Sequence, residues 1–165
     1  MAKVMIMSAV VTVKNRSNFA TWQRASWDDY VCDRNRLPAD QYRLFFHQGY
    51  LLITEMGWEG INHATICDLF TAILYVWFSI HPEQIASSLG RCLLEKAKET
   101  AGAPDLVLYL GDDYPRWQPG QPRRIDLNQW RVPDMVGENS DTTMACDIDE
   151  KKQLYAALGI PEYWV

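Results

Sequence analysis

Two short stretches in the last third of the chain place carboxylates at the ends of apolar runs. Asp105 opens the run 106–110, and Asp134 opens a second run that ends at Glu138. Each aspartate follows a proline, and apolar runs entered through such a turn are typical of buried strands. Because side chains alternate along a strand, Asp134, Glu138 and Ser140 would share one face. Carboxylates at neighbouring strand ends are suited to hold a divalent cation against a phosphate.

A lysine is predicted to lie on the apolar face of a helix over residues 147–158. An α-helix repeats every ~3.6 residues, so Lys151 falls near the middle of the apolar stripe and Lys152 towards its edge. The stripe consists of Ile148, Leu154, Tyr155 and Leu158. A buried charge needs a partner, which makes Lys151 a candidate for the carboxylate site. The alternative is a lysine whose amine extends past the stripe into water.

The other predicted elements form the scaffold for these residues. Ser26 begins a predicted helix, residues 42–46 and 50–54 a predicted hairpin, and residues 84–99 a further helix. Residues 62–80 are strongly apolar, which is compatible with a membrane span of ~20 apolar residues or with a core helix. Asp68 interrupts the run and favours the buried core helix. The spacing of Asp147 and Glu150 predicts a capping box, and Gly159 a helix end.

Four motifs together indicate a family. They are Pro-Asp before the strand at 104–105, Pro-Asp-x-Val-x-Glu-x-Ser at 133–140, Asp-x-x-x-Lys-x-x-x-Tyr at 147–155, and Gly-Ile-Pro-Glu-Tyr-Trp-Val at 159–165. With these motifs, residues 25–165 resemble the Uma2 family (DUF820), which is abundant in cyanobacteria and belongs to the PD-(D/E)XK nuclease superfamily. Residues 1–24 would be a leader of uncertain structure. The family usually continues with further strands, so the resemblance implies a domain shortened at its C-terminus.

The resemblance implies a restriction endonuclease-like α/β fold, with a mixed central sheet flanked by helices. It also implies a cytoplasmic Mg²⁺- or Mn²⁺-dependent endonuclease that hydrolyses phosphodiester bonds of DNA. Asp105 and Glu138 would bind the metal, and Lys151 would complete the catalytic set. The superfamily places its lysine two residues after the glutamate, where this chain has Ser140. The resemblance therefore implies a migrated lysine, supplied by the following helix.

Three further residues are accessory candidates with structural alternatives. Asp134 is equally well explained as a turn residue at the start of a strand. Ser140 occupies the superfamily's lysine position, and His63 opens the apolar helix, where a plain structural role ranks above a catalytic one. Tyr155 and Trp164 are most simply core residues.

The loop over residues 111–131 is a candidate DNA-contacting segment. It contains three prolines and intersperses tryptophans with Arg116, Arg123, Arg124 and Arg131. Arginines beside aromatic rings suit phosphate contacts and base stacking. The alternative, a solvated loop whose tryptophans pack on the core, ranks higher because four arginines form a small cluster.

Composition limits the function classes without selecting one. A net charge of −5 and a pI of about 5.1 exclude a general nucleic-acid binder, but a nuclease can bind phosphate through a metal and a local basic patch. The four cysteines lack zinc-finger or redox spacing and indicate reduced thiols. Superfamily relatives and an open C-terminal edge strand favour a homodimer. A catalytically inactive relative that binds DNA or protein is the alternative function.

Overall fold

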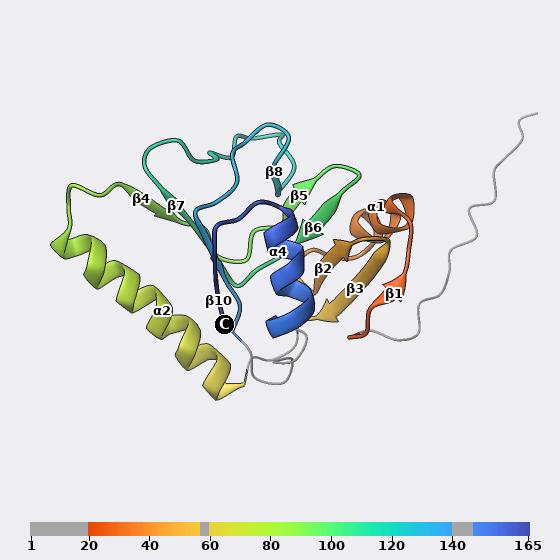
Figure 1. The fold of residues 1–165 in the computed structure, drawn as a ribbon, viewed down its shortest axis with the longest axis horizontal. Coiled ribbons are helices and arrows are strands. Elements are labelled where there is room, and N and C mark those ends of the chain that lie inside the picture. Colours follow the sequence, from red (N-terminus) through yellow and green to blue (C-terminus); the bar gives the residue numbers. More distant parts are fainter. Residues whose placement is uncertain (1–19, 57–59, 140–146) are drawn as a thin grey trace, which may run out of the picture.

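Strand segments from both halves of the chain assemble into two sheets that share one main core (Figure 1). The computed structural model describes residues 20–56, 60–139 and 147–165. One sheet has the order β1-β3-β2-β6-β5-β8 and the other β10-β9-β7-β4. Both sheets mix parallel and antiparallel pairs. The predicted mixed α/β fold with flanking helices is confirmed, although the strands divide between two sheets.

The elements follow one another along the chain from the N-terminal strand to the C-terminal edge strand. The strands are β1 (Gln23–Arg24), β2 (Tyr42–His47), β3 (Tyr50–Glu55), β4 (Ala86–Ser88), β5 (Leu94–Lys96), β6 (Thr100–Gly102), β7 (Leu106–Leu110), β8 (Ile125–Asp126), β9 (Met135–Gly137) and β10 (Glu162–Trp164). The helices are α1 (Trp27–Arg36), α2 (Ile61–Ile80), the π-helical turn η1 (Asp147–Lys151) and α4 (Lys152–Ala157).

The predicted hairpin is confirmed as β2 and β3. Gln48 and Gly49 both have positive φ, 48° and 78°, which is the conformation that a two-residue turn between twisted strands requires. Alternation then gives β2 two faces. Leu44 and Phe46 pack towards α1, whereas Phe45 enters the main core. The Ser26 cap of α1 is also confirmed, because its hydroxyl accepts the N–H of Asp29.

The main core lies between the two sheets and α4. Phe45 and Leu52 come from the first sheet, Val107 and Val136 from the second, and Tyr155 from α4. The approach is close: a Cβ added at Gly102 of β6 would lie 2.9 Å from Leu154 Cδ2 and 3.1 Å from Tyr155 Cε1. Any larger residue at this position would require the Leu154 and Tyr155 side chains to shift, so the glycine lets α4 lie directly on the sheet.

The prediction that the apolar segment 62–80 is a buried core helix is wrong in one respect. The helix forms as α2, and Leu74 and Phe78 pack against Leu106, Leu108 and Met135 of the second sheet. No residue of α2 is buried, however, and its outer apolar side chains are exposed to solvent. The helix lies at the outer side of the fold, beside β7 and β4 (Figure 1). The narrow four-stranded sheet covers one side of the helix. By length and composition α2 is also long and apolar enough to cross a membrane.

The helix predicted over residues 84–99 does not form. The segment contains β4 and β5, and β4 pairs antiparallel with β7 through Ala86 and Leu110. Arg91 and Lys98 have φ values of 58° and 64°, which interrupt any helix. The segment thus consists of short strands joined by turns. Over a short distance, the spacing of their apolar residues resembles the period of a helix.

The C-terminal helix begins differently from its prediction and ends as predicted. Residues 147–151 form the π-helical turn η1 before α4 continues in α-helical geometry. The capping box predicted at Asp147 involves a side chain outside the described residues. Gly159 has a φ of 83° and ends the helix, while the N–H of Ile160 returns to the carbonyl of Tyr155. The chain then forms β10, which pairs in parallel with β9 at the sheet edge.

Candidate functional site

Asp105 and Glu138 lie directly opposite each other at one end of the second sheet. Strands β7 and β9 are antiparallel with Leu106 opposite Gly137, so the next positions outward are these two acids. Their side chains are 6% and 1% exposed, and they lie on the face that carries Val107 and Val136. The two strands therefore bring together the carboxylates that the sequence paired.

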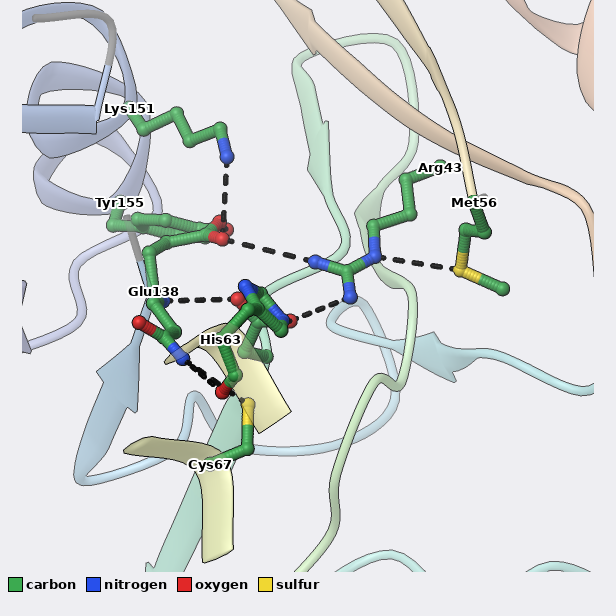
Figure 2. A network of polar contacts seen from close by, with 9 residues as sticks. Arg43, Met56, His63, Cys67, Glu138, Lys151 and Tyr155 are labelled. Carbon is green, nitrogen blue, oxygen red and sulfur yellow. Dashed lines mark hydrogen bonds and ion pairs between the residues drawn. The ribbon is translucent and has the colours of Figure 1, made fainter. Parts of the chain in front are cut away.

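Lys151 reaches this pair from the C-terminal helix (Figure 2). Its Nζ lies 3.2 Å from Oε2 of Glu138 and 4.3 Å from the ring centroid of Phe45. The side chain is buried, whereas that of Lys152 is exposed. The predicted inward direction of Lys151 is confirmed. The ion pair and the aromatic face compensate for part of the cost of burying its charge.

Tyr155 contacts Glu138 from one helical turn further along. Its hydroxyl donates a 2.6 Å hydrogen bond to Oε1. Burial, followed by the Glu138 charge, raises the pKa of Tyr155 well above its usual value, so the phenol stays protonated and serves as a donor. Tyr155 is a core residue, as predicted, and it also fixes the orientation of the carboxylate.

Arg43 is a member of the site that the sequence analysis missed. Its Nη2 lies 2.5 Å from Oδ1 of Asp105, its Nη1 4.0 Å from Oε2 of Glu138, and its Nε donates to the sulfur of Met56 (Figure 2). Burial alone would lower the pKa of Arg43, but the two carboxylates outweigh it and raise the pKa. The strand period could have indicated this position. Arg43 lies two residues before the core residue Phe45 on β2, so both side chains point to the same face of the sheet and the charge of Arg43 faces inward.

Asp105 is held as a carboxylate by its neighbours. Burial would raise its pKa, but the charge of Arg43, the N–H of Asn139 and His63 together lower it. The Asn139 N–H donates to Oδ2 at 2.9 Å. The other oxygen, Oδ1, is buried and has no hydrogen bond of good geometry, although it forms the ion pair with Arg43.

His63 and Cys67 face the same carboxylate from the first turns of α2. His63 Nε2 lies 3.9 Å from Oδ1 of Asp105. The Asn139 side-chain amide donates to the His63 carbonyl at 2.6 Å and to the Cys67 sulfur at 3.5 Å. Burial, ahead of smaller electrostatic effects, raises the pKa of the Cys67 thiol. Neither Cys67 nor Asn139 was singled out from the sequence, because Cys67 belongs to no motif and Asn139 is an unspecified position of the motif at 133–140.

Of the remaining accessory candidates, Asp134 does not join this cluster. Asp134 lies at the opposite end of β9 from Glu138, where it accepts the N–H of Leu110 at 2.6 Å and pairs with Arg131 at 2.9 Å. These contacts match its alternative explanation as a turn residue. Ser140 lies outside the described residues.

The arginine-containing loop begins after Leu110, at the far end of β7 from Asp105. Arg131 packs over the ring of Tyr109 and donates to the Asp113 carbonyl, while Arg124 pairs with Glu95 at 3.1 Å. Arg116 stacks over Tyr114 in a solvent-exposed position, and Arg123 is exposed as well. Arg124 and Arg131 thus have structural partners, and the loop lies away from the paired carboxylates.

The donor set at Asp105 and Glu138 fits a hard divalent cation. Two carboxylates suffice for such an ion, which keeps several waters. The buried Oδ1 of Asp105 has no hydrogen bond of good geometry, so it retains a lone pair that a cation could use. The guanidinium of Arg43 already lies beside both carboxylates, so a cation would compete with it.

Comparisons with known proteins agree with this fold. Residues 29–165 match the model of the Uma2 family, described as "Putative restriction endonuclease". The fold is similar to the crystal structure of "a putative nuclease belonging to DUF820" from Anabaena variabilis, with a TM-score of 0.54 and 16% sequence identity. That match covers 85% of this chain and 73% of the other. No curated protein sequence matches the chain.

Proposed function

The chain belongs to the Uma2 family, and on that premise we propose that it is a divalent-metal-dependent endonuclease that hydrolyses phosphodiester bonds of DNA in the cytoplasm. The observation that carries the proposal is the convergence of Asp105, Glu138 and Lys151 from two strands and a helix. Buried charges are costly, and a purely structural role would be met more cheaply by apolar residues.

Asp105 and Glu138 are the residues that would hold the cation. A bound Mg²⁺ or Mn²⁺ would polarise the scissile phosphodiester and lower the pKa of an attacking water. Tyr155 holds Oε1 of Glu138 by its hydrogen bond, which leaves Oε2 directed towards Lys151 and Arg43. The Glu138 carboxylate is therefore oriented before the reaction begins.

Lys151 would stabilise the negative charge that develops on the phosphate. Its ammonium is held beside Glu138 and over Phe45, so little reorganisation is needed as that charge develops. Arg43 cannot act as a base, because its guanidinium stays protonated. It contributes a fixed positive charge beside Asp105, and this charge keeps that carboxyl ionised.

A plasmid-cleavage assay with matched variants tests the proposal. The parent chain should convert supercoiled DNA to nicked or linear forms with Mg²⁺ and not with EDTA. Glu138→Gln should lose at least about 100-fold in rate. Asp134→Asn, a change at the other end of the same strand, should keep the parent's rate. Equal rates in the parent and Glu138→Gln would refute the proposed site. A parallel assay on RNA tests the choice of DNA.

The specific observation in favour of an inactive binding module is Arg43. The guanidinium of Arg43 lies beside both carboxylates and compensates for part of their negative charge without a metal, as expected of a site that no longer binds a cation. Binding of labelled DNA without cleavage at any Mg²⁺ or Mn²⁺ concentration would select this second function.

We further propose that two copies of the chain associate through the outer face of α2. A seam of apolar side chains, each 40–67% exposed, runs along four turns at alternating spacings of three and four residues. The seam residues are Ile66, Leu69, Ile73, Val76 and Ile80. This spacing produces the knobs and holes that another helix fills.

The composition of the seam favours an identical partner. The residues that flank it on one side, Thr65, Ala72 and Ser79, are small and uncharged. No ionisable side chain lies within the seam, so two identical faces can meet without like-charge repulsion. A helix of this length offers an interface about 30 Å long. The exposed α2 face therefore replaces the C-terminal edge strand as the proposed dimer contact.

A further inference from the structure

His63, Cys67 and Asp105 form a cluster with the chemistry of a transition-metal site. His63 and Cys67 are four residues apart on α2, which places both on one side of the helix. A ring nitrogen, the sulfur and a carboxylate oxygen all lie within 4.8 Å of one another. The nuclease proposed above needs only the carboxylate of this group.

Two further observations indicate that the cluster is built rather than accidental. The Oδ1 atom of Asp105, 3.9 Å from the His63 ring, is buried and has no hydrogen bond of good geometry, although it forms an ion pair with Arg43 at 2.5 Å. Asn139 contacts all three residues: its N–H donates to Asp105, and its side-chain amide donates to the Cys67 sulfur and the His63 carbonyl. Such outer hydrogen bonds orient metal ligands and keep the sulfur in an accepting role.

The ligand types differ from those of the carboxylate pair. Magnesium prefers oxygen ligands, whereas imidazole and thiolate select zinc and its first-row neighbours. Three protein ligands with a fourth position open is the usual arrangement of a reactive zinc site. From zinc bond lengths of about 2.0–2.3 Å, tetrahedral ligand atoms lie roughly 3.5 Å apart. Side-chain rotations that shorten the distances by roughly 1 Å would close the cluster around one ion.

We propose that His63, Cys67 and Asp105 bind one late first-row transition cation, such as Zn²⁺, and that this binding removes Asp105 from the Mg²⁺ site. The inhibitory part rests on the proposed nuclease function, while the binding part does not. Because Asp105 belongs to both donor sets, the two cations exclude each other by competition for one carboxylate.

Cobalt(II) spectroscopy of the full chain tests the binding part without reference to activity. Co²⁺ bound by a thiolate gives an intense near-ultraviolet charge-transfer band. The parent chain should show this band at one equivalent of Co²⁺, and Zn²⁺ should displace it while Mg²⁺ does not. Cys67→Ser should abolish the band. Cys92→Ser, which removes another partly buried thiol away from the cluster, should keep it.

His63→Ala should weaken Co²⁺ binding at least about tenfold and leave the fold intact by circular dichroism. Absence of a band in the parent, or a band that survives Cys67→Ser, would overturn the site. Should a variant fail to fold, alkylation of the thiols of the parent, with modification of Cys67 verified by peptide mass spectrometry, provides the same comparison, and retention of the band after this modification would equally overturn the site.

The inhibitory part is tested in the Mg²⁺-dependent cleavage assay. Zn²⁺ should inhibit the parent, and Cys67→Ser should raise the concentration for half inhibition at least about tenfold, measured against its own zinc-free rate. An unchanged concentration would refute the competition. A cobalt band in a protein that does not cleave DNA with Mg²⁺ would refute the nuclease proposal alone. Cleavage by a protein without a cobalt band would refute only the transition-metal site.

Discussion

Lys151 and Glu138 form a buried ion pair, with 3.2 Å between Nζ and Oε2, across the junction of the second sheet and the C-terminal helix. The lysine belongs to the π-helical turn η1, immediately before α-helical geometry resumes at Lys152. Two adjacent lysines are thereby separated into one buried and one exposed side chain. The pair provides the sharpest comparison that the chain offers.

We expect Lys151→Ala to abolish metal-dependent DNA cleavage, with a loss of at least about 100-fold, because the charge beside Glu138 is removed. Lys152→Ala should keep most of the activity, since this side chain points to solvent. Cleavage rates and circular dichroism of both variants provide the measurement. Lys151→Met keeps the apolar stem over Phe45 and guards against loss of folding. Parent-like cleavage by Lys151→Ala and Lys151→Met would reduce Lys151 to a packing residue.

Arg43→Gln should make the protein less stable without metal and more responsive to it. Removing one partner of a buried ion pair costs about 3–5 kcal/mol, because Asp105 loses its cation. Mg²⁺ would then stabilise the variant more than the parent, as it no longer competes with the guanidinium. Thermal unfolding with and without Mg²⁺ measures the difference.

The matched control for Arg43 is Arg124→Gln, which also removes an arginine from a buried carboxylate, here Glu95. It should lower the unfolding temperature without enlarging the Mg²⁺ response. Equal Mg²⁺ responses in the parent and Arg43→Gln would show that Arg43 does not compete for the carboxylates.

Acid should destabilise the fold partly through Asp105. Its pKa in the folded protein is lowered, so the folded state binds fewer protons than the unfolded chain. The resulting stabilisation is present above the unfolded value of about 4 and is lost as pH falls through the lower folded pKa. Urea unfolding of the parent between about pH 5 and pH 2 should show a steeper fall than that of Asp105→Asn. Parallel curves would contradict this assignment.

Charge placed in the α2 seam should dissociate the proposed dimer. Ile73→Glu puts two like charges at the centre of the interface, whereas Tyr75→Glu places the same charge on an exposed residue of another face. Light scattering should give a dimer mass for the parent and Tyr75→Glu, and a monomer mass for Ile73→Glu. A monomeric parent refutes the dimer, and sedimentation of the monomer with neutral lipid vesicles would identify a bilayer as the partner of α2.

The local patterns predicted the elements that carry the paired carboxylates. Pro-Asp before an apolar run marked β7 and β9, and the helical period separated Lys151 from Lys152, because both signals depend on neighbours in sequence. The apolar spacing of residues 84–99 led to a wrong helix prediction. This spacing is compatible with a helix or with strands, and the tertiary pairing of β4 with β7 decided for strands. The apolar spacing also does not indicate which side of α2 packs against the second sheet and which side stays exposed.

The contacts that cross between elements were not predictable from one sequence. Arg43 meets Asp105 only because the two sheets share a core, and no local pattern encodes that approach. The same holds for Cys67 and Asn139, which lie far apart in sequence and come together where the first turns of α2 contact the residue that follows Glu138. Alternation along β2 could have placed Arg43 inward, but not beside a named acid.

The charges of four site residues have a consequence for the order of assembly. Asp105 and Glu138 balance Arg43 and Lys151, so this quartet presents almost no net field to an incoming phosphate. Adding a divalent cation changes the local sum to about +2. Phosphate and cation would then show heterotropic cooperativity, each tightening the binding of the other by the same factor. In a chain with an overall charge of −5, nucleic acid would thus be recruited by the metal-loaded form, and the charge balance itself would disfavour unproductive encounters.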